Sequence, residues 1–231
     1  MNAAKPPQSA ASQDDAALTR LFRPKSVAVI GASSALHKIG AIPLTHLIRH
    51  GYAGKIYPIN PKATEVQGLR TYPNMASIGA PVDMAIVAVP AVAAGTAIEE
   101  AALAGARSAV VFTSGYAEVG PEGAAAQERL AVIARQHNMA ILGPNCLGFM
   151  NVREKLYATF SPAPFAGLVD TGNVGMVTQS GAFGGYAYSM ARERGMGLSY
   201  WMSTGNQCSV DVAACIEWLA NDPHTKVIMA Y

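Results

Sequence analysis

Residues 25–34, KSVAVIGASS, decide the fold. Residues 26–31 form a continuous apolar run, which is typical of a strand that is buried on both faces. The run ends at Gly31, and the small residues 32–34 follow it. Backbone N–H groups in such a turn come close to phosphates and carboxylates, so we expect an anion-binding turn at this strand end.

The same pattern recurs along the chain. Further strand-like runs occur over residues 55–60, 82–89, 108–113 and 139–143. Helix-like segments lie between them, over residues 40–50, 93–104 and 121–137. Strands that alternate with helices predict an α/β fold with a doubly wound, Rossmann-like parallel sheet and right-handed crossovers. In such a sheet ligands bind at the carboxyl ends of the strands.

A second alternating unit begins near residue 173, with strands over 173–179, 198–204 and 226–231 and helices over 180–194 and 210–220. We therefore expect four parts along the chain. They are a disordered tail over residues 1–15, a first domain over 16–156, a linker over 157–172 and the start of a second domain over 173–231. Because the sequence stops inside a strand-like run, the second domain is expected to be truncated.

The composition fits buried sheets and gives no sign of nucleic-acid binding. Hydrophobic residues make up 51% and charged residues 14% of the chain, and the net charge is +2. Such low charge suggests further burial in an oligomer. The three cysteines lack metal spacing and indicate free thiols in a reducing compartment. Since neither a secretory h-region nor a membrane-spanning run is visible, we expect a cytoplasmic protein.

The turn over residues 31–40 suits a nucleotide, or is an ordinary connection between a strand and a helix. The dinucleotide fingerprint GxGxxG is absent, because Ser33 and Leu36 stand where it requires glycine. Residues 60–62, NPK, follow the second strand, where NAD sites often carry an acidic residue. A lysine there suits a phosphorylated ribose, or is simply solvated.

Two later turns also carry polar groups. In residues 143–151, GPNCLGFMN, Cys146 offers a thiol, but no histidine can be paired with it, which disfavours nucleophilic catalysis. In residues 178–185, TQSGAFGG, Ser180 is expected to cap a helix, and the next glycine lets an anion approach. The nucleophile elbow GxSxG is not met. No pair of histidines in the sequence has convincing metal spacing, so no metal site is predicted.

Taken together, these motifs resemble the NDP-forming acyl-CoA synthetase superfamily, which includes the alpha subunit of succinyl-CoA synthetase. The resemblance runs from about residue 18 to residue 231. It rests on LFRPKSVAVIGAS (21–33), YPINPK (57–62), DMAIVAVPA (83–91), VVFTSGYAE (110–118), ILGPNCLGFMN (141–151), VGMVTQSGA (174–182) and STGNQCSVD (203–211). It implies a Rossmann-like CoA-binding domain followed by a flavodoxin-like, succinyl-CoA synthetase-like domain.

The resemblance also implies where coenzyme A and phosphate bind. The CoA phosphates would lie against Gly31, Ala32, Ser33, Ser34, Lys38, Ile39 and Gly40. The nucleotide end would lie near Asn60, Pro61 and Lys62, and the rest of the slot would be lined by Val89, Pro90, Phe112, Thr113 and Ser114. The thiol would point towards Asn145 and Cys146. The phosphate of a phosphohistidine would be held by Ser180, Gly181 and Ala182.

The implied reaction makes acyl-CoA from a carboxylic acid, CoA and ATP, through an acyl phosphate and a phosphohistidine. None of the five histidines matches the family's phosphorylated histidine. The ATP-grasp domain or subunit that binds ATP or ADP with Mg is also absent from the sequence, so the chain alone is expected to bind CoA without completing the reaction. Two alternatives stay open. They are a CoA-binding regulatory region of a protein lysine acetyltransferase and, less favoured, an NAD(P)-dependent oxidoreductase.

Overall fold

The first sheet has five parallel strands in the order β2-β1-β5-β6-β7. This sheet is part of a computed structural model that describes residues 11–231. The strands are β1 (Ser26–Ile30), β2 (Lys55–Ile59), β5 (Met84–Val87), β6 (Ser108–Val111) and β7 (Ala140–Leu142). The predicted doubly wound α/β sheet is confirmed, and each strand lies within its predicted run.

Both faces of this sheet are buried, which explains the continuous apolar runs. Val27 and Val29 of β1 face one core, whereas Ala28 and Ile30 face another, because successive side chains of a strand point to opposite faces. Helix α2 (Ala41–Arg49) packs on the first core, and α3 (Ala91–Leu103) and α4 (Pro121–His137) cover the second. Within residues 11–231, no helix combines the length and the apolar character needed to cross a membrane.

The second sheet is mixed and has the order β12-β10-β11-β8-β9. Strands β10 (Thr171–Thr178), β11 (Leu198–Ser203) and β12 (Val227–Ala230) are parallel, whereas β8 (Gly148–Asn151) and β9 (Leu156–Thr159) are antiparallel. Helices α5 (Gly181–Glu193) and α6 (Val212–Asn221) pack on opposite faces. Smaller elements are the hairpin of β3 (Glu65–Val66) and β4 (Leu69–Arg70) and the 3-10 helices η1 (Ala76–Ile78), η2 (Ala117–Val119) and η3 (Ala163–Ala166).

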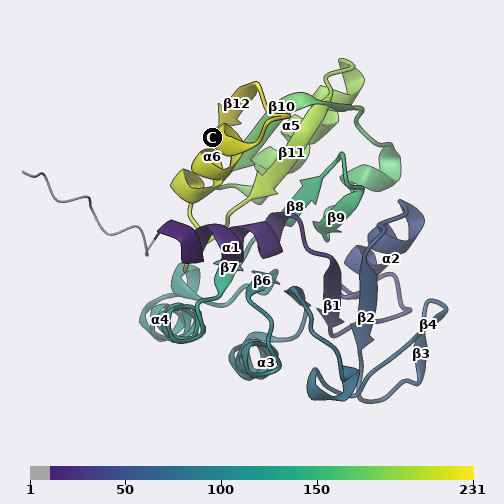
Figure 1. Cartoon of the computed structure of the whole chain (residues 1–231), viewed down its shortest axis with the longest axis vertical. Coiled ribbons are helices and arrows are strands. Elements are labelled where there is room, and N and C mark those ends of the chain that lie inside the picture. The colour runs from purple at the N-terminus through teal and green to yellow at the C-terminus, as the bar shows by residue number, and fades with distance from the viewer. Residues whose placement is uncertain (1–10) are drawn as a thin grey trace, which may run out of the picture.

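Helix α1 (Ala11–Phe22) joins the two sheets. In Figure 1 this helix, coloured purple, runs between the first sheet below and the second sheet above. Leu21 and Phe22 are fully buried in a core that contains Val29 of the first sheet and Tyr200 of the second. The ring of Phe22 meets that of Phe149 edge-on, with 5.2 Å between centroids. The two sheets therefore share one apolar core.

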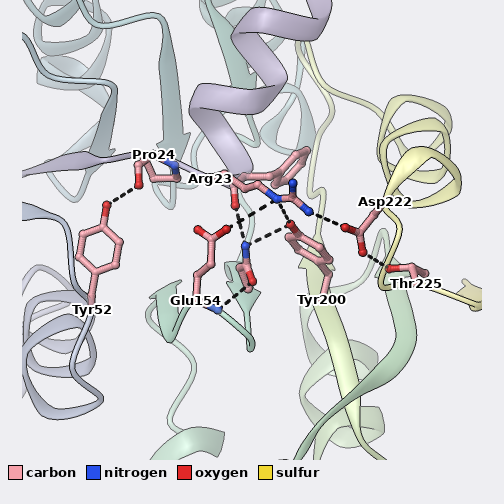
Figure 2. Close-up of polar contacts among 9 residues, drawn as sticks. Arg23, Pro24, Tyr52, Glu154, Tyr200, Asp222 and Thr225 are labelled. Carbon is pink, nitrogen blue, oxygen red and sulfur yellow. Dashed lines mark hydrogen bonds and ion pairs between the residues drawn. The ribbon is translucent and has the colours of Figure 1, made fainter.

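Arg23, directly after α1, adds polar contacts to this junction (Figure 2). Its Nε donates to the Tyr200 hydroxyl at 3.0 Å, and its Nη2 lies 2.5 Å from Asp222 Oδ1. The Asp222 side chain is only 1% exposed, so the guanidinium compensates a buried charge. The adjacent carbonyl of Pro24 accepts a hydrogen bond from the Tyr52 hydroxyl at 2.6 Å. Residues 23–24 thus tie the first domain to the second sheet.

Three predictions about the chain's organisation differ from the structure. Residues 1–10 lie outside the described residues, but residues 11–15, expected in a disordered tail, belong to α1. The residues of β8 and β9, which the prediction divides between the first domain and the linker, form strands of the second sheet, where β8 pairs with β11 and β9 pairs with β8. The linker over 157–172 also contains η3. These elements depend on partners that are distant in the sequence, so their local pattern does not reveal them.

His46 of α2 contacts the segment that follows β9. Its side chain is fully buried, and its Nε2 lies 3.0 Å from the carbonyl oxygen of Ser161. Because a carbonyl only accepts, Nε2 carries the proton, and Nδ1 faces His50 Nε2 at 3.3 Å. The Phe165 ring stacks on the imidazole at 4.2 Å between centroids. Burial first, and then the nearby His50 and Arg49, lower the pKa of His46 to about 4.

We expect the chain to lose stability as the pH falls from about 7 to about 4. The unfolded state binds a proton at His46 near pH 6.5, whereas the folded state binds it only near pH 4, so the free energy of unfolding decreases through this window. The contribution of His46 is about 2–3 kcal/mol. Urea unfolding across this pH range measures it.

His46→Gln removes the titrating group, so this variant should lose less stability between pH 7 and pH 4 than the parent chain. His37→Gln, which alters an exposed histidine, is the matched control and should keep the parent's pH dependence. An identical acid-side loss in His46→Gln would show that another group is responsible.

Candidate functional site

Five of the predicted turns lie along one edge of the first sheet. They follow the carboxyl ends of β1, β2, β5, β6 and β7, and these strands are all parallel. The connection after β1 runs to β2 on one side, whereas the connection after the neighbouring β5 runs to β6 on the other side. Such a topological switch point is where open α/β sheets bind ligands.

The predicted residues differ in their exposure. Those open to solvent are Ser34, Lys38, Ile39, Pro61, Lys62, Pro90, Ser114, Asn145 and Ala182. The half-buried ones are Gly31, Ser33, Asn60, Val89, Thr113, Ser180 and Gly181. The buried ones are Ala32, Gly40, Phe112 and Cys146. The first two groups are accessible to a ligand, whereas the buried residues mainly support the turns.

The turn after β1 is compact because glycine stands at both of its ends. Gly31 has φ +88°, and a Cβ added there would lie 2.5 Å from the Ala88 carbonyl oxygen. A Cβ on Gly40 would lie 2.0 Å from the Gly31 carbonyl oxygen. Helix α2 begins directly after Gly40, so its N-terminus lies against the end of β1. A helix N-terminus at this position favours an anion.

The first two amides of this turn are already used within the protein. The N–H groups of Gly31 and Ala32 donate to the Ile59 carbonyl oxygen at 3.1 and 3.2 Å. Asn60 Nδ2 donates to the Ala32 carbonyl oxygen at 2.9 Å, which fastens the turn after β2 to the turn after β1. An anion at this site would therefore meet the groups of residues 33–40 instead of these two amides.

Gln67 braces the same turn, although the sequence analysis does not single it out. Its Nε2 donates to the carbonyl oxygens of Ser33 at 3.0 Å and Ala41 at 3.1 Å. Its Oε1 accepts from Thr45 Oγ1 at 2.9 Å. These partners lie 22 to 34 residues earlier in the chain, so no local sequence signal marks Gln67.

We expect Gly40→Ala to destabilise the protein by about 2 kcal/mol, because the added Cβ would overlap the Gly31 carbonyl oxygen. The φ of Gly40 is −70°, which alanine adopts readily, so the cost is steric. Gly185→Ala is the matched control, since nothing lies within 4 Å of its added Cβ, and it should stabilise α5 by about 0.5–1 kcal/mol. Chemical denaturation measures both, and equal effects would contradict the close approach at Gly40.

A cavity of about 360 Å³ lies between the carboxyl edge of the first sheet and the turn that precedes α5, and we call it the crevice. The turns after β6 and β7 contribute Phe112, Asn145 and Cys146 to its lining. Those from the turn between β10 and α5 are Ser180, Gly181 and Ala182. Residues that the sequence analysis missed are Leu147, Phe160 and Gln179. The fold thus brings two separately predicted groups to one cavity.

Ser180 caps α5, as predicted. Its Oγ accepts a hydrogen bond from the Phe183 N–H at 3.3 Å. Thr178 Oγ1 donates to the Ser180 carbonyl oxygen at 2.9 Å and fixes the turn. The first N–H groups of a helix lack intrahelical partners, and the helix dipole is positive at this end. The N-terminus of α5 can therefore stabilise a phosphoryl group or a carboxylate in the crevice.

A polar network fastens a loop of the second domain to the turn that carries Asn145. Asn145 Nδ2 donates to Asn206 Oδ1 at 3.3 Å, and Asn206 Nδ2 donates to Glu118 Oε2 at 2.5 Å. Glu118 Oε1 accepts from the Gly115 N–H at 2.6 Å. Slight burial raises the pKa of Glu118, but the hydrogen bonds from Gly115 and Asn206 outweigh it and lower this pKa. Glu118 is therefore ionised, and its carboxylate holds the Gly115 N–H and the Asn206 side chain in place.

Cys146 is a packing residue in this structure. It is 3% exposed, and its Sγ donates to the Val111 carbonyl oxygen at 3.4 Å. Burial raises the pKa of the Cys146 thiol to about 12, although backbone hydrogen bonds act in the opposite direction. Burial also raises the pKa values of Cys208 and Cys215 to about 12. Because the nucleophile is the thiolate, this agrees with the low weight that the sequence gives to nucleophilic catalysis.

We expect iodoacetamide to label the three cysteines of the folded chain only slowly at pH 8. A pKa of about 12 instead of 9 lowers the thiolate fraction of all three thiols about a thousandfold. Burial also limits access of the reagent to Cys146 and Cys215, whereas Cys208 is half-buried and depends on its raised pKa alone. Mass spectrometry after timed alkylation measures this, and all three thiols should react in denaturant. Fast labelling of Cys146 without denaturant would contradict the buried thiol.

Two family models match this chain. Residues 25–152, more than half of its length, match the family described as CoA binding domain. Residues 171–231 match the family described as succinyl-CoA ligase like flavodoxin domain. The first match covers the first sheet, its helices α2 to α4 and also β8 of the second sheet, and the second match covers β10, β11 and β12.

Several known proteins are similar to nearly the whole chain. A trans-feruloyl-CoA synthase from an unknown prokaryotic organism is 38% identical over 93% of this chain and 30% of that protein. The alpha subunit of an ADP-forming acetate–CoA ligase from Pyrococcus furiosus is 38% identical over 93% of this chain and 46% of that subunit. A structure of dinucleotide forming acetyl-coenzyme A synthetase 1 from Ca. Korarchaeum cryptofilum, in complex with phosphate and ADP, has a TM-score of 0.88 and 38% identity, over 94% of this chain and 45% of that one. The chain thus spans less than half the length of these relatives.

Proposed function

Because this chain belongs to the family of CoA-binding domains, we propose that it is the CoA-binding part of an ADP-forming acyl-CoA synthetase. The observation that carries the proposal is the crevice, in which a turn at the carboxyl edge of a Rossmann-like sheet faces the N-terminus of α5. Such a cavity can bring the end of a long cofactor to a phosphoryl group. Relatives named as ADP-forming CoA ligases support the same proposal.

The residues along the carboxyl edge suit coenzyme A. The close contact of Gly31 with Gly40 keeps side chains away from the N-terminus of α2, where a phosphate would be stabilised. Lys62 is exposed beyond β2 and would act as a point charge for the 3′-phosphate. Thr113 Oγ1 donates to the Val89 carbonyl oxygen at 2.7 Å, which fixes two half-buried residues where the pantetheine arm would lie. The thiol would then reach Asn145.

In the proposed reaction this chain orients CoA and offers the N-terminus of α5 to a phosphoryl group. The positive end of the helix dipole would stabilise the negative charge that develops during phosphoryl and acyl transfer. The phosphorylated histidine, and the ATP-grasp domain or subunit that binds ATP or ADP with Mg²⁺, would lie outside these 231 residues. The carboxylic acid and the thiol would therefore react only in the assembled enzyme.

We also infer the setting of this enzyme from the described surface. The three cysteines are unpaired, which fits the reducing environment of the cytoplasm. Tyr186 of α5 and Met229 of β12 are apolar and exposed, and they lie beside the same shallow apolar pocket. Such a patch fits burial against a further domain or subunit.

The alternative functions gain no specific support. In an NAD(P) site an acidic residue after the second strand holds the ribose, but Asn60 stands there and donates to the Ala32 carbonyl oxygen. The relatives described above are named as a CoA synthase, a CoA ligase and a coenzyme A synthetase, and none of those three is named as an acetyltransferase.

We expect CoA to bind the purified chain with a Kd in the micromolar range, about −8 kcal/mol. Dephospho-CoA should bind more weakly, because it lacks the 3′-phosphate that Lys62 would meet. Lys62→Ala should weaken CoA about two- to fivefold, and it should weaken dephospho-CoA less. Isothermal titration calorimetry measures all of these affinities.

Lys55→Ala is the matched control for this experiment. Lys55 is an exposed lysine at the amino end of the same strand, β2, and so lies at the opposite edge of the sheet. This variant should bind CoA as the parent chain does. NADH serves as the comparison ligand, and tighter binding of NADH than of CoA would overturn the proposed function.

A further inference from the structure

We propose that Gln67 is a positioning residue, which shapes the turn after β1 for the phosphates of CoA without touching the ligand. Gln67 lies at the tip of the hairpin of β3 and β4, which packs beside β2 at the edge of the first sheet (Figure 1). The inference rests on the proposed function, because it takes the turn over residues 31–40 as the place where the phosphates bind. It adds to that function a residue outside the turn.

The backbone of Gln67 has a conformation that is unfavourable for glutamine. Residues 67 and 68 are the two central residues of the hairpin turn, and their φ values are +52° and +80°. Positive φ at both positions is the mark of a type I′ turn, which strongly favours Asn-Gly. Glutamine pays for the left-handed backbone without the local hydrogen bonds that help asparagine. The turn alone would therefore be better served by asparagine, which points to a role for the glutamine side chain elsewhere.

The side chain of Gln67 closes the turn after β1. Its Nε2 donates to the carbonyl oxygen of Ser33 at 3.0 Å and to that of Ala41, the first residue of α2, at 3.1 Å. One amide group thus ties the beginning of the turn to the beginning of the helix. Both carbonyl oxygens carry partial negative charge, and these hydrogen bonds partly neutralise it. The turn is therefore less repulsive to an anion.

The closed turn offers donors that the protein itself does not use. In the part of the chain that the structure describes, the N–H groups of Ser34, Ile39 and Gly40 meet no acceptor. Ser34 Oγ accepts a hydrogen bond from the Gln67 N–H at 3.3 Å, so the hydroxyl has its own hydrogen left to donate. The match to the CoA binding domain includes this turn, which makes phosphate the anion that these donors suit.

The length of the glutamine side chain is essential to this arrangement. Its Oε1 also accepts a hydrogen bond from Thr45 Oγ1 at 2.9 Å, so both ends of the amide are engaged. Asparagine is shorter by one methylene group, and hydrogen bonds tolerate only a narrow range of distances. An asparagine at position 67 would keep the hairpin but release the turn. The bond to Ser34 would then weaken too, because the tip of the hairpin would no longer be held against the turn.

Gln67→Asn separates positioning from folding. We expect this variant to keep a denaturation midpoint close to the parent's, because asparagine suits the turn and Ala41 keeps a hydrogen bond from Thr45 Oγ1 at 2.9 Å. It should bind CoA about three- to tenfold more weakly. A residue that only stabilised the fold would lower stability and affinity together. Gln67→Gly is the second variant, since glycine adopts positive φ without strain, and the same result is expected. Urea unfolding and isothermal titration calorimetry measure the two quantities.

Gln207→Asn is the matched control. Gln207 is also a glutamine with positive φ, +59°, and its Oε1 accepts from the Val212 N–H at 3.1 Å in the second domain. The same shortening at this position should leave the affinity for CoA unchanged.

A double-mutant cycle shows whether Gln67 acts through the turn. Ser34→Ala removes the hydroxyl that Gln67 orients, so Ser34→Ala and Gln67→Asn together should weaken CoA by less than the product of the two single effects. Lys62→Ala provides the comparison, because Lys62 and Gln67 share no hydrogen-bond partner among the described residues. Its effect should multiply with that of Gln67→Asn. A fold-stabilising role would not produce this difference between the two cycles.

The outcomes separate the two proposals. If the parent chain does not bind CoA, the proposed function and this inference fall together. If the parent binds CoA and both Gln67 variants bind it as tightly, only the inference about Gln67 fails. It also fails if both variants lose stability in step with affinity, or if the effects of Ser34→Ala and Gln67→Asn multiply.

Discussion

The position of every candidate site residue depends on the apolar core that the two sheets share. Leu21 and Phe22 of α1 are buried in this core together with side chains of both sheets. Protein interiors are close-packed, so neither sheet can slide over the other without opening voids. Arg23 fixes the junction further, because its guanidinium meets the buried Asp222. Packing that lies away from the crevice therefore sets the distance between the edge of the first sheet and the N-terminus of α5.

Because of this packing, the crevice combines two features, each of which comes from a different sheet. The edge of the first sheet provides turns in which glycine allows the backbone to come close, as at Gly31 and Gly40. The second sheet provides a capped helix N-terminus with a positive dipole. The network from Glu118 through Asn206 to Asn145 connects the two at the mouth of the crevice. Burial also decides protonation there, since it keeps the Cys146 thiol neutral.

Much of the fold could be predicted from the sequence, because its main elements have local signals. A strand buried on both faces produces an apolar run, as in β1, β5, β6 and β7, whereas β2 at the edge of the sheet begins with the exposed Lys55. Pro121 and His137 bound α4 as predicted. Helix α1 and strands β8 and β9 were not predicted. What places them is contact with residues far away in the chain, such as the pairing of β8 with β11.

The sequence by itself determined the parallel sheet, the turns at its carboxyl edge and the cap at Ser180, since each depends on residues that are close in the chain. It also identified the family through the order of those turns. Only the tertiary structure decided that Phe112 and Ser180 line one cavity, and that Phe160, Leu147 and Gln67 support the site. Cavities and long-range hydrogen bonds are set by how the sheets pack, and that packing is a property of the whole core, which no single stretch of sequence encodes.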